Sequence, residues 1–470
     1  MTVEIPRGIA VADVGATNTK LALFSAAGQL LAERKIASRH VEGPPYRWID
    51  PEPVVAFFRQ AIPELDRILP IDVVVPCAHG AALACVASDG ALALRVMDYT
   101  SEPPPEIVAE YRKIMPPFSE SYCSLLPMAL THGLQLYWQQ RALPEAFAKV
   151  AAVMPWIQYV GFRLSGRMVT EITSMSCQTH LMNVAKGGFS SLVKRQGWEH
   201  LFPPMVKAWE EIGDLKPEFR GQGLRGQARV LGGIHDSSAN YVRYLAGGFG
   251  HFTLLSTGTW SISFDTSTTV GQLREDYDTS TNTDIFGRNV ATSRFFGGRE
   301  FELVAGDAGS ASPSLDDIRS FVTRGVMALP SFSGSAGPMP GTEGRGHIEG
   351  VAPTKPGERV SLASLYCALM VAEQLDAVGS RHDVIVDGPF AQNSVLLQVL
   401  AQLRAGQKVF ASELRDGTAA GAACLGLMHD GKLPHVDLKL AEVKPAAIPG
   451  LRDYQARWRD QAGASSGSHG

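Results

Sequence analysis

Residues 8–24 read GIAVADVGATNTKLALF, and this stretch sets the expected fold of the chain. Residues 8–13 are almost all apolar, residues 14–19 are mostly small or polar, and residues 20–24 are apolar after one lysine. Apolar runs bounded by glycine and small polar residues are typical of β-strands. The stretch therefore predicts a strand, a tight turn and a second strand, and a third strand is expected near residues 29–36.

The same pattern occurs again in the second half of the chain. Residues 254–264 read LLSTGTWSISF, which predicts a strand at 253–255, a turn at 256–259 and a strand at 260–265. We interpret this recurrence as a weak internal duplication. The boundary is placed at Gly247-Gly248, so residues 1–246 are the predicted N-terminal domain and residues 247–462 the predicted C-terminal domain. The tail at 463–470, GASSGSHG, is of low complexity and is predicted to be disordered.

Helical and strand patterns alternate between these stretches. Apolar spacing predicts helices at residues 51–69, 124–140, 143–153, 190–212 and 235–245, and continuous apolar runs predict buried strands at 71–76 and 228–232. Strands that alternate with helices indicate an α/β architecture. The predicted fold class is therefore α/β, with two similar domains.

The composition limits the kinds of partner that the protein is expected to bind. The 470 residues include 43 Lys+Arg and 47 Asp+Glu, and this net charge of −4 favours neither nucleic acid nor an anionic membrane. The N-terminus lacks a signal-peptide pattern. The uncharged run at 244–264 is interrupted by glycines, so it is not expected to form a membrane-spanning helix. The six cysteines are scattered without a CxxC pair, which indicates reduced, buried thiols. We expect a soluble, cytoplasmic protein.

The turn in the first stretch has the composition of a phosphate site. Its small residues expose successive backbone N–H groups, Thr17 and Asn18 add side-chain donors, and Lys20 adds a cation. Asp13 ends the first strand and supplies the oxygen ligand that Mg²⁺ prefers beside a nucleotide. An ordinary hairpin with an aspartate at its bend remains the alternative.

Two stretches in the second half have features that suit a nucleotide. The turn at 257–259 has the same small, polar character as the first turn. At 384–393, VIVDGPFAQN, a predicted strand ends in a turn where Gly388 would let a flat ring approach the backbone. Asn393 starts the helix that follows, where its amide is expected to reach a nucleotide. Further along, alanines flank Gly421, so another element is expected to pack tightly against that helix.

One aspartate is a candidate general base. Residues 228–240, ARVLGGIHDSSAN, predict a strand, a glycine pair and a helix that starts at His235-Asp236. Asp236 has two interpretations, as the N-cap of that helix or as a base that accepts a proton from a substrate hydroxyl.

Two nucleotide-binding patterns are excluded. GxxxxGK[ST] does not occur, which excludes a P-loop kinase. GQGLRG at 221–226 fits GxGxxG, but no predicted strand precedes it and no predicted helix follows it, so it lacks the context of a dinucleotide-binding fold.

Taken in this order, the motifs resemble those of the FGGY family of carbohydrate kinases, within the actin-like ATPase superfamily. DVGATNTKLALF is similar to the family's first phosphate motif, LLSTGTWSISF to the second, VDGPFAQN with the later DGTAAGAA to the adenosine motif, and LGGIHDSSAN to the segment with the catalytic aspartate. The resemblance covers nearly the whole chain. It implies two ribonuclease-H-like domains joined by a hinge, with an interdomain cleft that binds ATP and Mg²⁺.

The resemblance also implies roles for individual residues. Asp236 is the implied base toward the sugar hydroxyl, and Asp13 and Asp236 are the implied metal contacts. In one place the chain departs from the family, because the usual second glycine of the adenosine motif is Pro389, which lacks an N–H donor. The implied nucleotide contacts are Thr17, Asn18, Lys20, Gly258, Thr259, Gly388 and Asn393.

The implied sugar site lies in the first half of the chain. His79-Gly80 follows the strand at 71–76 and is similar to a segment that contacts the ketose in xylulose kinases, with a purely structural histidine as the alternative. Asp98, Glu171 and Gln178 complete the implied site, since carboxylates and amides suit the hydroxyls of a polyol. The STGTWS turn and the chain length are more similar to rhamnulose and fuculose kinases. We therefore expect a ketose, either a 6-deoxyketohexose or a pentulose, as the substrate of a monomer or homodimer.

Two other classes of function remain open. One is a non-catalytic regulator that binds a sugar or nucleotide on the same fold, against which the presence of both Asp13 and Asp236 argues. The other is an actin-like chaperone or phosphatase, and the pocket-like segments at 77–82 and 171–178 favour a small polyol over it.

Overall fold

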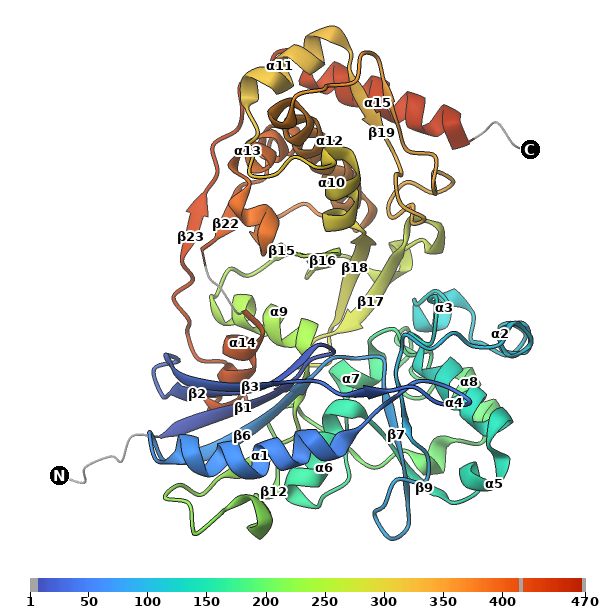
Figure 1. Cartoon of the computed structure of the whole chain (residues 1–470), viewed down its shortest axis with the longest axis vertical. Coiled ribbons are helices and arrows are strands. Elements are labelled where there is room, and N and C mark those ends of the chain that lie inside the picture. Colours follow the sequence, from blue (N-terminus) through green and yellow to red (C-terminus); the bar gives the residue numbers. More distant parts are fainter. Residues whose placement is uncertain (1–6, 414–416, 467–470) are drawn as a thin grey trace, which may run out of the picture. The chain divides into compact units, whose positions relative to one another are not determined.

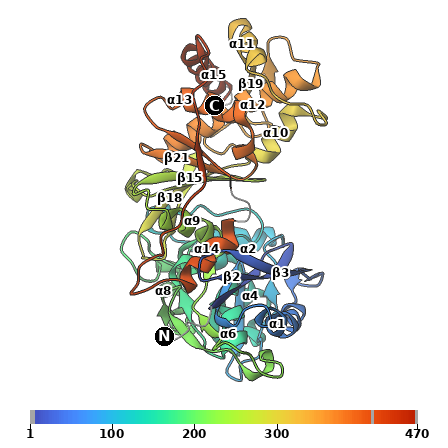
Figure 2. The same ribbon diagram turned by 90° about the vertical axis from the view of Figure 1, so that its left-hand side faces the viewer.

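The computed structural model describes residues 7–413 and 417–466. Contacts within the chain divide it into two compact units. The first consists of Met1–Gly248, Thr281–Asn289 and Asp416–Val436, and the second of Phe249–Ser280, Val290–Arg415 and Asp437–Gly470. The chain therefore returns to the first unit after most of the second is complete. Figure 2 shows this return as the red helix α14 among the blue and green elements.

The first unit is built on a mixed sheet in the order β12-β13-β6-β1-β2-β3, with β14 also paired to β6. Strand β1 is antiparallel to β2 and parallel to β6. The predicted strands at 8–13, 20–24, 29–36, 71–76 and 228–232 are all confirmed within a few residues. The strands are β1 (Gly8–Val14), β2 (Asn18–Ser25), β3 (Leu30–Ala37), β6 (Ile71–Ala78), β12 (Glu211–Asp214), β13 (Arg229–Leu231) and β14 (Ile234–His235).

Helices cover both faces of this sheet, as Figure 1 shows. Successive side chains of a strand point to opposite faces. Ala10 and Ala12 of β1 therefore pack with α1 (Pro51–Asp66) and α6 (Trp156–Ser165). Ile9 and Val11 pack on the other side with α9 (Asp236–Ala246) and α14 (Gly417–Gly426). This double burial explains why β1 is a continuous apolar run.

The second unit repeats the arrangement. Its sheet has the order β17-β18-β16-β15-β21-β22-β23, and β15 is antiparallel to β16 and parallel to β21, just as β1 is to β2 and β6. The predicted duplication and the α/β class are thus confirmed. The strands are β15 (Phe252–Thr257), β16 (Ser261–Asp265), β17 (Thr279–Thr283), β18 (Asn289–Phe295), β21 (Asp383–Asp387), β22 (Val409–Ser412) and β23 (Leu440–Glu442). The helices are α10 (Gly297–Ala305), α11 (Leu315–Arg324), α12 (Pro356–Ala377), α13 (Ser394–Leu403) and α15 (Leu451–Ser466).

Short elements complete the two units. The remaining strands are β4 (His40–Val41), β5 (Trp48–Ile49), β7 (Leu83–Ala87), β8 (Val96–Met97), β9 (Val150–Pro155), β10 (Thr170–Glu171), β11 (Met205–Val206), β19 (Met327–Leu329) and β20 (His347–Glu349). The remaining α-helices are α2 (Pro105–Arg112), α3 (Phe118–Ser121), α4 (His132–Ala142), α5 (Pro144–Phe147), α7 (Ile172–Ser176) and α8 (Ser191–Gln196). The 3₁₀ segments are η1 (Glu199–Leu201), η2 (Pro217–Phe219), η3 (Val270–Gln272), η4 (Glu275–Tyr277) and η5 (Pro389–Gln392).

Three of the predicted helices are wrong in extent or type. The helix predicted at 124–140 starts only at His132. In the region predicted as a helix at 143–153, residues from Val150 onward form β9, which pairs with β7, so strand pairing overrides the apparent helical period. The helix predicted at 190–212 ends at Gln196, because Gly197 takes a left-handed conformation (φ 67°) and Pro203-Pro204 follow.

The C-terminal helix corrects the prediction of a disordered tail. Helix α15 continues through Ser466, so residues 463–466 are helical, and residues 467–470 lie outside the described residues. Leu451, Tyr454, Trp458 and Ala462 are buried at helical spacing, which anchors this helix on the second unit.

Two further predictions concern membrane spans and thiols. The uncharged run at 244–264 is divided among the end of α9, β15 and β16, and so forms no continuous helix. One helix of the described residues, α12, is long and apolar enough to span a membrane. Of its most apolar window, 83% is buried inside the structure. All six cysteines are buried, and none forms a disulfide in the described part of the chain.

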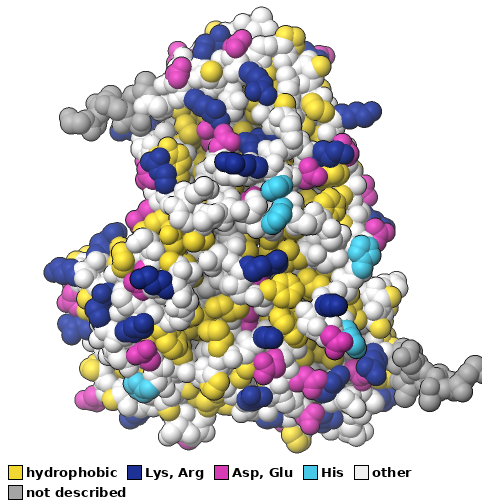
Figure 3. Space-filling model, turned by 180° about the vertical axis from the view of Figure 1, so that it is seen from behind, with side chains coloured by type: hydrophobic (Ala, Val, Ile, Leu, Met, Phe, Trp, Pro, Cys, Tyr) yellow, Lys and Arg dark blue, Asp and Glu magenta, His cyan; other side chains and the backbone are white. Residues whose placement is uncertain are grey.

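Charged side chains of both signs are interspersed on the face of the molecule that Figure 3 shows.

Candidate functional site

A first pocket of ≈ 410 Å³ lies at the turn between β1 and β2. It brings together the predicted residues Asp13, Thr17, Asn18 and Lys20. Asp13 and Lys20 are opposite each other in the β1–β2 ladder, and Lys20 Nζ lies 3.4 Å from Asp13 Oδ2. The pocket is also lined by Gly15, Ala16, Glu33 and Lys35.

Lys35 is a cation at this pocket that sequence reasoning missed. It lies on β3 directly opposite Lys20 in the β2–β3 register. The sequence could have indicated Lys35, because the predicted third strand is expected to pair with the second, and paired residues of neighbouring antiparallel strands lie side by side. Two lysines in one pocket suit an anion with several charged oxygens.

The chemistry of this pocket fits a Mg²⁺ ion bound together with phosphates. No group of three or more His, Cys, Asp or Glu side chains is placed to hold a metal among residues 7–413 and 417–466. Mg²⁺ bound with a nucleotide needs only one or two carboxylates, since phosphate oxygens and waters supply the other ligands. The single buried carboxylate of Asp13, in a pocket that also contains two lysines, meets that requirement.

A second pocket, also of ≈ 410 Å³, lies in the second unit. It contains the predicted residues Gly258, Thr259 and Asn393. The first turn of α10 closes one side, and there a Cβ at Gly298 would lie 2.4 Å from the Gly258 carbonyl oxygen. Gly298 was missed, although a Gly-Gly pair at a helix start could have indicated it. The lining also includes Arg299, Phe301, Glu302, Pro389 and Phe390.

Gly388 is needed for a reason different from the one predicted. It is not among the residues that line the second pocket, although Pro389 after it is. Gly388 has φ +83°, and a Cβ there would be 1.9 Å from the Thr257 carbonyl oxygen. The Thr257 hydroxyl donates to the Asp387 carbonyl and accepts from the Phe390 N–H. Gly388 therefore allows β15 and the chain after β21 to come together, and no ring of a ligand is required to explain it.

Asn393 and Pro389 have local structural roles beside the pocket. Asn393 Oδ1 accepts the N–H of Leu396 at 3.0 Å and caps α13, while its Nδ2 donates to Ser364 Oγ at 2.9 Å. Pro389 begins η5, and the first N–H of a helix has no partner within the helix, so proline fits well there. Both side chains still line the pocket.

Asp236 is the first residue of α9, and its carboxylate is partly exposed. Oδ1 accepts the Ser237 N–H at 2.6 Å and lies 3.2 Å from His235 Nε2. The N-cap is therefore His235, not Asp236, and the N-cap interpretation of Asp236 is wrong by one position. Each of these contacts is made by Oδ1.

His235 joins several of the predicted sugar residues into one buried cluster. A Cβ at Gly80 would lie 2.8 Å from His235 Nε2, so His235 packs on the backbone of the His79-Gly80 segment. Burial lowers the pKa of His235, but the neighbouring Cys177, Asp236 and Glu171 outweigh burial and raise it to about 9. His235 therefore carries a positive charge beside Asp236 at neutral pH. It was not predicted as a site residue.

Glu171 lies under this cluster and is fully buried. Its Oε2 accepts hydrogen bonds from the backbone and side chains of Thr173 and Ser174, and the Thr173 hydroxyl accepts the His235 N–H at 3.2 Å. Burial raises the pKa of Glu171 to about 7 despite these hydrogen bonds. The other oxygen, Oε1, is also buried and has no hydrogen-bond partner among the described residues.

His79 and Gln178 also lie near this cluster. His79 Nδ1 is 2.7 Å from the Gly80 carbonyl oxygen, and burial lowers the pKa of His79. Gln178 follows Cys177, is half-buried, and has a left-handed backbone (φ 57°), which is uncommon for a residue with a side chain. His79, Gly80, Glu171 and Asp236 are thus brought together, and Gln178 directly follows Cys177, which acts on His235 in the same cluster.

Asp98 has different surroundings. It is 1% exposed, and its Oδ1 accepts the N–H and hydroxyl of Thr100 at 2.9 Å each. Oδ2 lies 2.6 Å from His40 Nδ1 and 3.4 Å from Arg47 Nε. Both oxygens therefore have partners within the chain, and this geometry gives no support to Asp98 as a sugar ligand.

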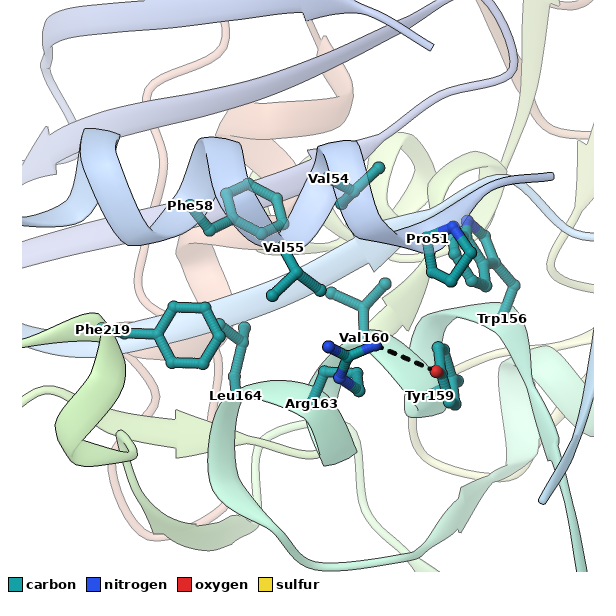
Figure 4. A pocket seen from close by; sticks show the side chains of 10 residues that line it. All are labelled: Pro51, Val54, Val55, Phe58, Trp156, Tyr159, Val160, Arg163, Leu164 and Phe219. Atoms are coloured by element: carbon teal, nitrogen blue, oxygen red, sulfur yellow. Dashed lines mark hydrogen bonds between the residues drawn. The ribbon is translucent and has the colours of Figure 1, made fainter. Parts of the chain in front are cut away.

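A third cavity, between α1 and α6, is too small for a substrate. Figure 4 shows its lining, in which Arg163 Nη1 donates to the Tyr159 hydroxyl at 3.2 Å. The cavity measures ≈ 10 Å³, which is at most the space of one water molecule. It is lined by Pro51, Val54, Val55, Phe58, Trp156, Tyr159, Val160, Arg163, Leu164 and Phe219.

Two family models match the chain. Residues 249–435 match "Carbohydrate kinase FGGY, C-terminal domain", and residues 109–242 match "FGGY family of carbohydrate kinases, N-terminal domain". Among curated proteins, the rhamnulokinase of Lactiplantibacillus plantarum is 28% identical over 129 residues, which is 27% of this chain and 26% of that protein. The match thus spans about a quarter of the length of this relative.

Solved structures are similar over almost the whole chain. A carbohydrate kinase from Novosphingobium aromaticivorans is 30% identical with a TM-score of 0.88, and the similarity covers 97% of this chain and 98% of that one. A ligand-bound xylulose kinase from Lactobacillus acidophilus has a TM-score of 0.79 and 14% identity, covering 98% of this chain and 99% of that one. The latter similarity concerns the fold alone.

Proposed function

Because the chain belongs to the FGGY family of carbohydrate kinases, we propose that it transfers the γ-phosphoryl group of ATP to a hydroxyl of a ketose. The observation that carries this proposal is the placement of Asp236. It combines a partly exposed carboxylate at a helix start with a buried polar cluster around His235, in the same unit as the lysine-lined first pocket. When a nucleotide is bound in the same protein, such a carboxylate is suited to act as a general base that accepts the proton of a substrate hydroxyl.

The reaction balances with the groups that the chain supplies. The sugar hydroxyl gives its proton to Asp236 Oδ2, because the contacts of Asp236 with Ser237 and His235 are made by Oδ1. The sugar oxygen then bonds to the γ-phosphorus, the bond from that phosphorus to the β,γ-bridging oxygen breaks, and ADP leaves. His79 and Glu171 would hold other hydroxyls, since each offers a ring nitrogen or a carboxylate oxygen near Asp236.

Each pocket, taken by itself, suits a chemical group that a nucleotide contains. In the first pocket, backbone N–H groups, Thr17, Asn18, Lys20 and Lys35 would hold phosphate oxygens. A Mg²⁺ ion held by Asp13, with Asp236 as a second proposed contact, would neutralise part of the phosphate charge. In the second pocket, apolar Phe301 and Phe390 beside Gly258, Thr259 and Asn393 suit the nucleoside.

A 6-deoxyketohexose is the ketose that we propose first. The two curated relatives that match the chain are rhamnulokinases, and STGTWS resembles the same kinases. The His79-Gly80 segment keeps a pentulose as the second candidate. The hydroxyls of either sugar suit the polar groups around His235.

An ATP-coupled screen of ketohexoses, 6-deoxyketoses, ketopentoses and alditols tests the activity. Asp236→Asn should abolish turnover while ATP still binds, because the amide cannot accept the hydroxyl proton. Asp89→Asn, which changes an exposed turn aspartate in the same unit, is the matched control and should keep normal turnover. Normal turnover of Asp236→Asn would refute the base assignment. ATP binding without turnover of any sugar would favour a non-catalytic regulator.

A further inference from the structure

The backbone carbonyls of the turn that lines the first pocket accept hydrogen bonds from residues that follow β3. The Ser38 hydroxyl donates to the Gly15 carbonyl at 2.8 Å, and the Ser38 N–H donates to the Thr17 carbonyl at 2.9 Å. Between them, His40 Nε2 lies 2.7 Å from the Ala16 carbonyl oxygen. Three consecutive carbonyls of the turn therefore point toward Ser38 and His40.

This arrangement determines where the N–H groups of the turn point. In a planar trans peptide the C=O and the following N–H point in opposite directions. The N–H groups that follow these three carbonyls therefore point away from Ser38 and His40. The first pocket is lined by residues 15–18 and not by Ser38 or His40, so the donors are directed to the pocket side.

His40 is held in turn by Asp98. Nδ1 lies 2.6 Å from Asp98 Oδ2, in an ion pair that is not aligned as a hydrogen bond. Burial favours a raised pKa for Asp98, but the Thr100 hydrogen bonds and the charges of His40 and Arg47 outweigh it and lower that pKa. Asp98 is therefore ionised at neutral pH.

The contact with the turn fixes the direction of the hydrogen bond. A carbonyl oxygen only accepts, so His40 Nε2 carries the proton and donates it to the Ala16 carbonyl. The His40 side chain is only 17% exposed, so this hydrogen bond lies close behind the turn and is shielded from water.

We propose that His40, held by Asp98, is a positioning residue that orients the N–H groups of the turn toward the phosphates of ATP. The proposal rests on the proposed function and deepens it, because it concerns phosphate binding at the same pocket. It also gives Asp98 a different role from the sugar contact implied by the resemblance. Neither residue touches the reacting atoms.

Three variants test the proposal by ATP affinity and steady-state kinetics. His40→Ala removes the hydrogen bond to the Ala16 carbonyl and leaves that acceptor unsatisfied, so it should weaken ATP binding and raise KM for ATP roughly ten- to hundredfold. His40→Gln supplies an amide donor and should recover most of this loss. Asp98→Asn should also raise KM for ATP. In all three variants KM for the sugar should stay within about twofold of the wild type.

A control separates this role from a general effect on folding. His429→Ala removes the exposed pair between His429 Nδ1 and Asp430 Oδ2 (3.1 Å) and should leave ATP affinity unchanged. Thermal unfolding of each variant identifies folded protein, and Asp98→Asn keeps the test valid if His40→Ala does not fold. ATP binding measured by calorimetry needs no sugar turnover, so failure of this inference is distinguishable from failure of the proposed kinase activity.

Two results would overturn the proposal. One is unchanged ATP affinity in folded His40→Ala or, if that variant does not fold, in folded Asp98→Asn. The other is a rise in KM for the sugar, and not for ATP, in Asp98→Asn, which would make Asp98 a sugar ligand.

Discussion

Helix α14 packs against α9 through a single glycine, and this contact gives the sharpest test of the first unit. A Cβ at Gly421 would lie 1.8 Å from the Ala239 carbonyl oxygen and 2.6 Å from the Ala239 carbonyl carbon. The close approach confirms the tight packing predicted from the alanines around Gly421. Since α9 starts at Asp236, any displacement of α9 also moves the proposed base.

The cost of Gly421→Ala follows from this geometry. An ordinary contact begins near 3.4 Å, so the new methyl group must gain about 1.6 Å of separation (3.4 minus 1.8) from Ala239. The obstacle is backbone, which no rotamer change can move. Alanine is favoured over glycine in a helix by about 1 kcal/mol, whereas overpacking typically costs about 1–3 kcal/mol and sometimes more. With the obstacle fixed, the overpacking cost is at the upper end, so we expect a net destabilisation of roughly 2 kcal/mol (about 3 minus about 1).

The prediction is measured by thermal unfolding and by kinase turnover. At about 2–4 °C per kcal/mol for a unit of this size, Tm should fall by roughly 4–8 °C, and kcat should fall with the displacement of Asp236. Gly463→Ala is the matched control, because Gly463 is also helical but has no atom within 4 Å of an added Cβ, so Tm should be unchanged or slightly higher. A Gly421→Ala protein with wild-type Tm and kcat would refute this account of the α9–α14 packing.

Two further substitutions test the buried carboxylate and the second unit. With a pKa raised by burial from 4.5 to about 7, Glu171 stabilises the fold fully below about pH 4.5 and loses this stabilisation as the pH rises to about 7. Glu171→Gln cannot titrate, so between pH 5 and pH 8 its stability should improve relative to the wild type by up to roughly 3 kcal/mol; a constant difference in unfolding free energy would contradict this. Gly388→Ala places a Cβ 1.9 Å from Thr257, so it should lower Tm and weaken ATP binding in calorimetry. Gly406→Ala also has positive φ (+108°) but open space, so an equal loss there would show that backbone strain alone is responsible.

The positions of the main strands and of Asp236 could be predicted from the sequence because their signals are local. A buried strand appears as a continuous apolar run, and a tight turn as a group of small residues, whatever the rest of the chain does. The repeat at 254–264 likewise predicted a second sheet, which has the same pairing around β15 as the first has around β1. The helix predicted at 143–153 failed because β9 is defined by its pairing with β7, more than 60 residues earlier.

The sequence by itself determined the duplicated α/β fold, the two turns and the candidate base Asp236. Only the tertiary structure showed that Gly388 accommodates the Thr257 carbonyl, that His235 carries a charge beside Asp236, and that Asp98 is held by His40. These features depend on contacts between distant segments, such as the 24 residues that separate His40 from Ala16. Local patterns identify the type of residue at a position, whereas its hydrogen-bond partners and protonation state arise from neighbours that only folding brings together.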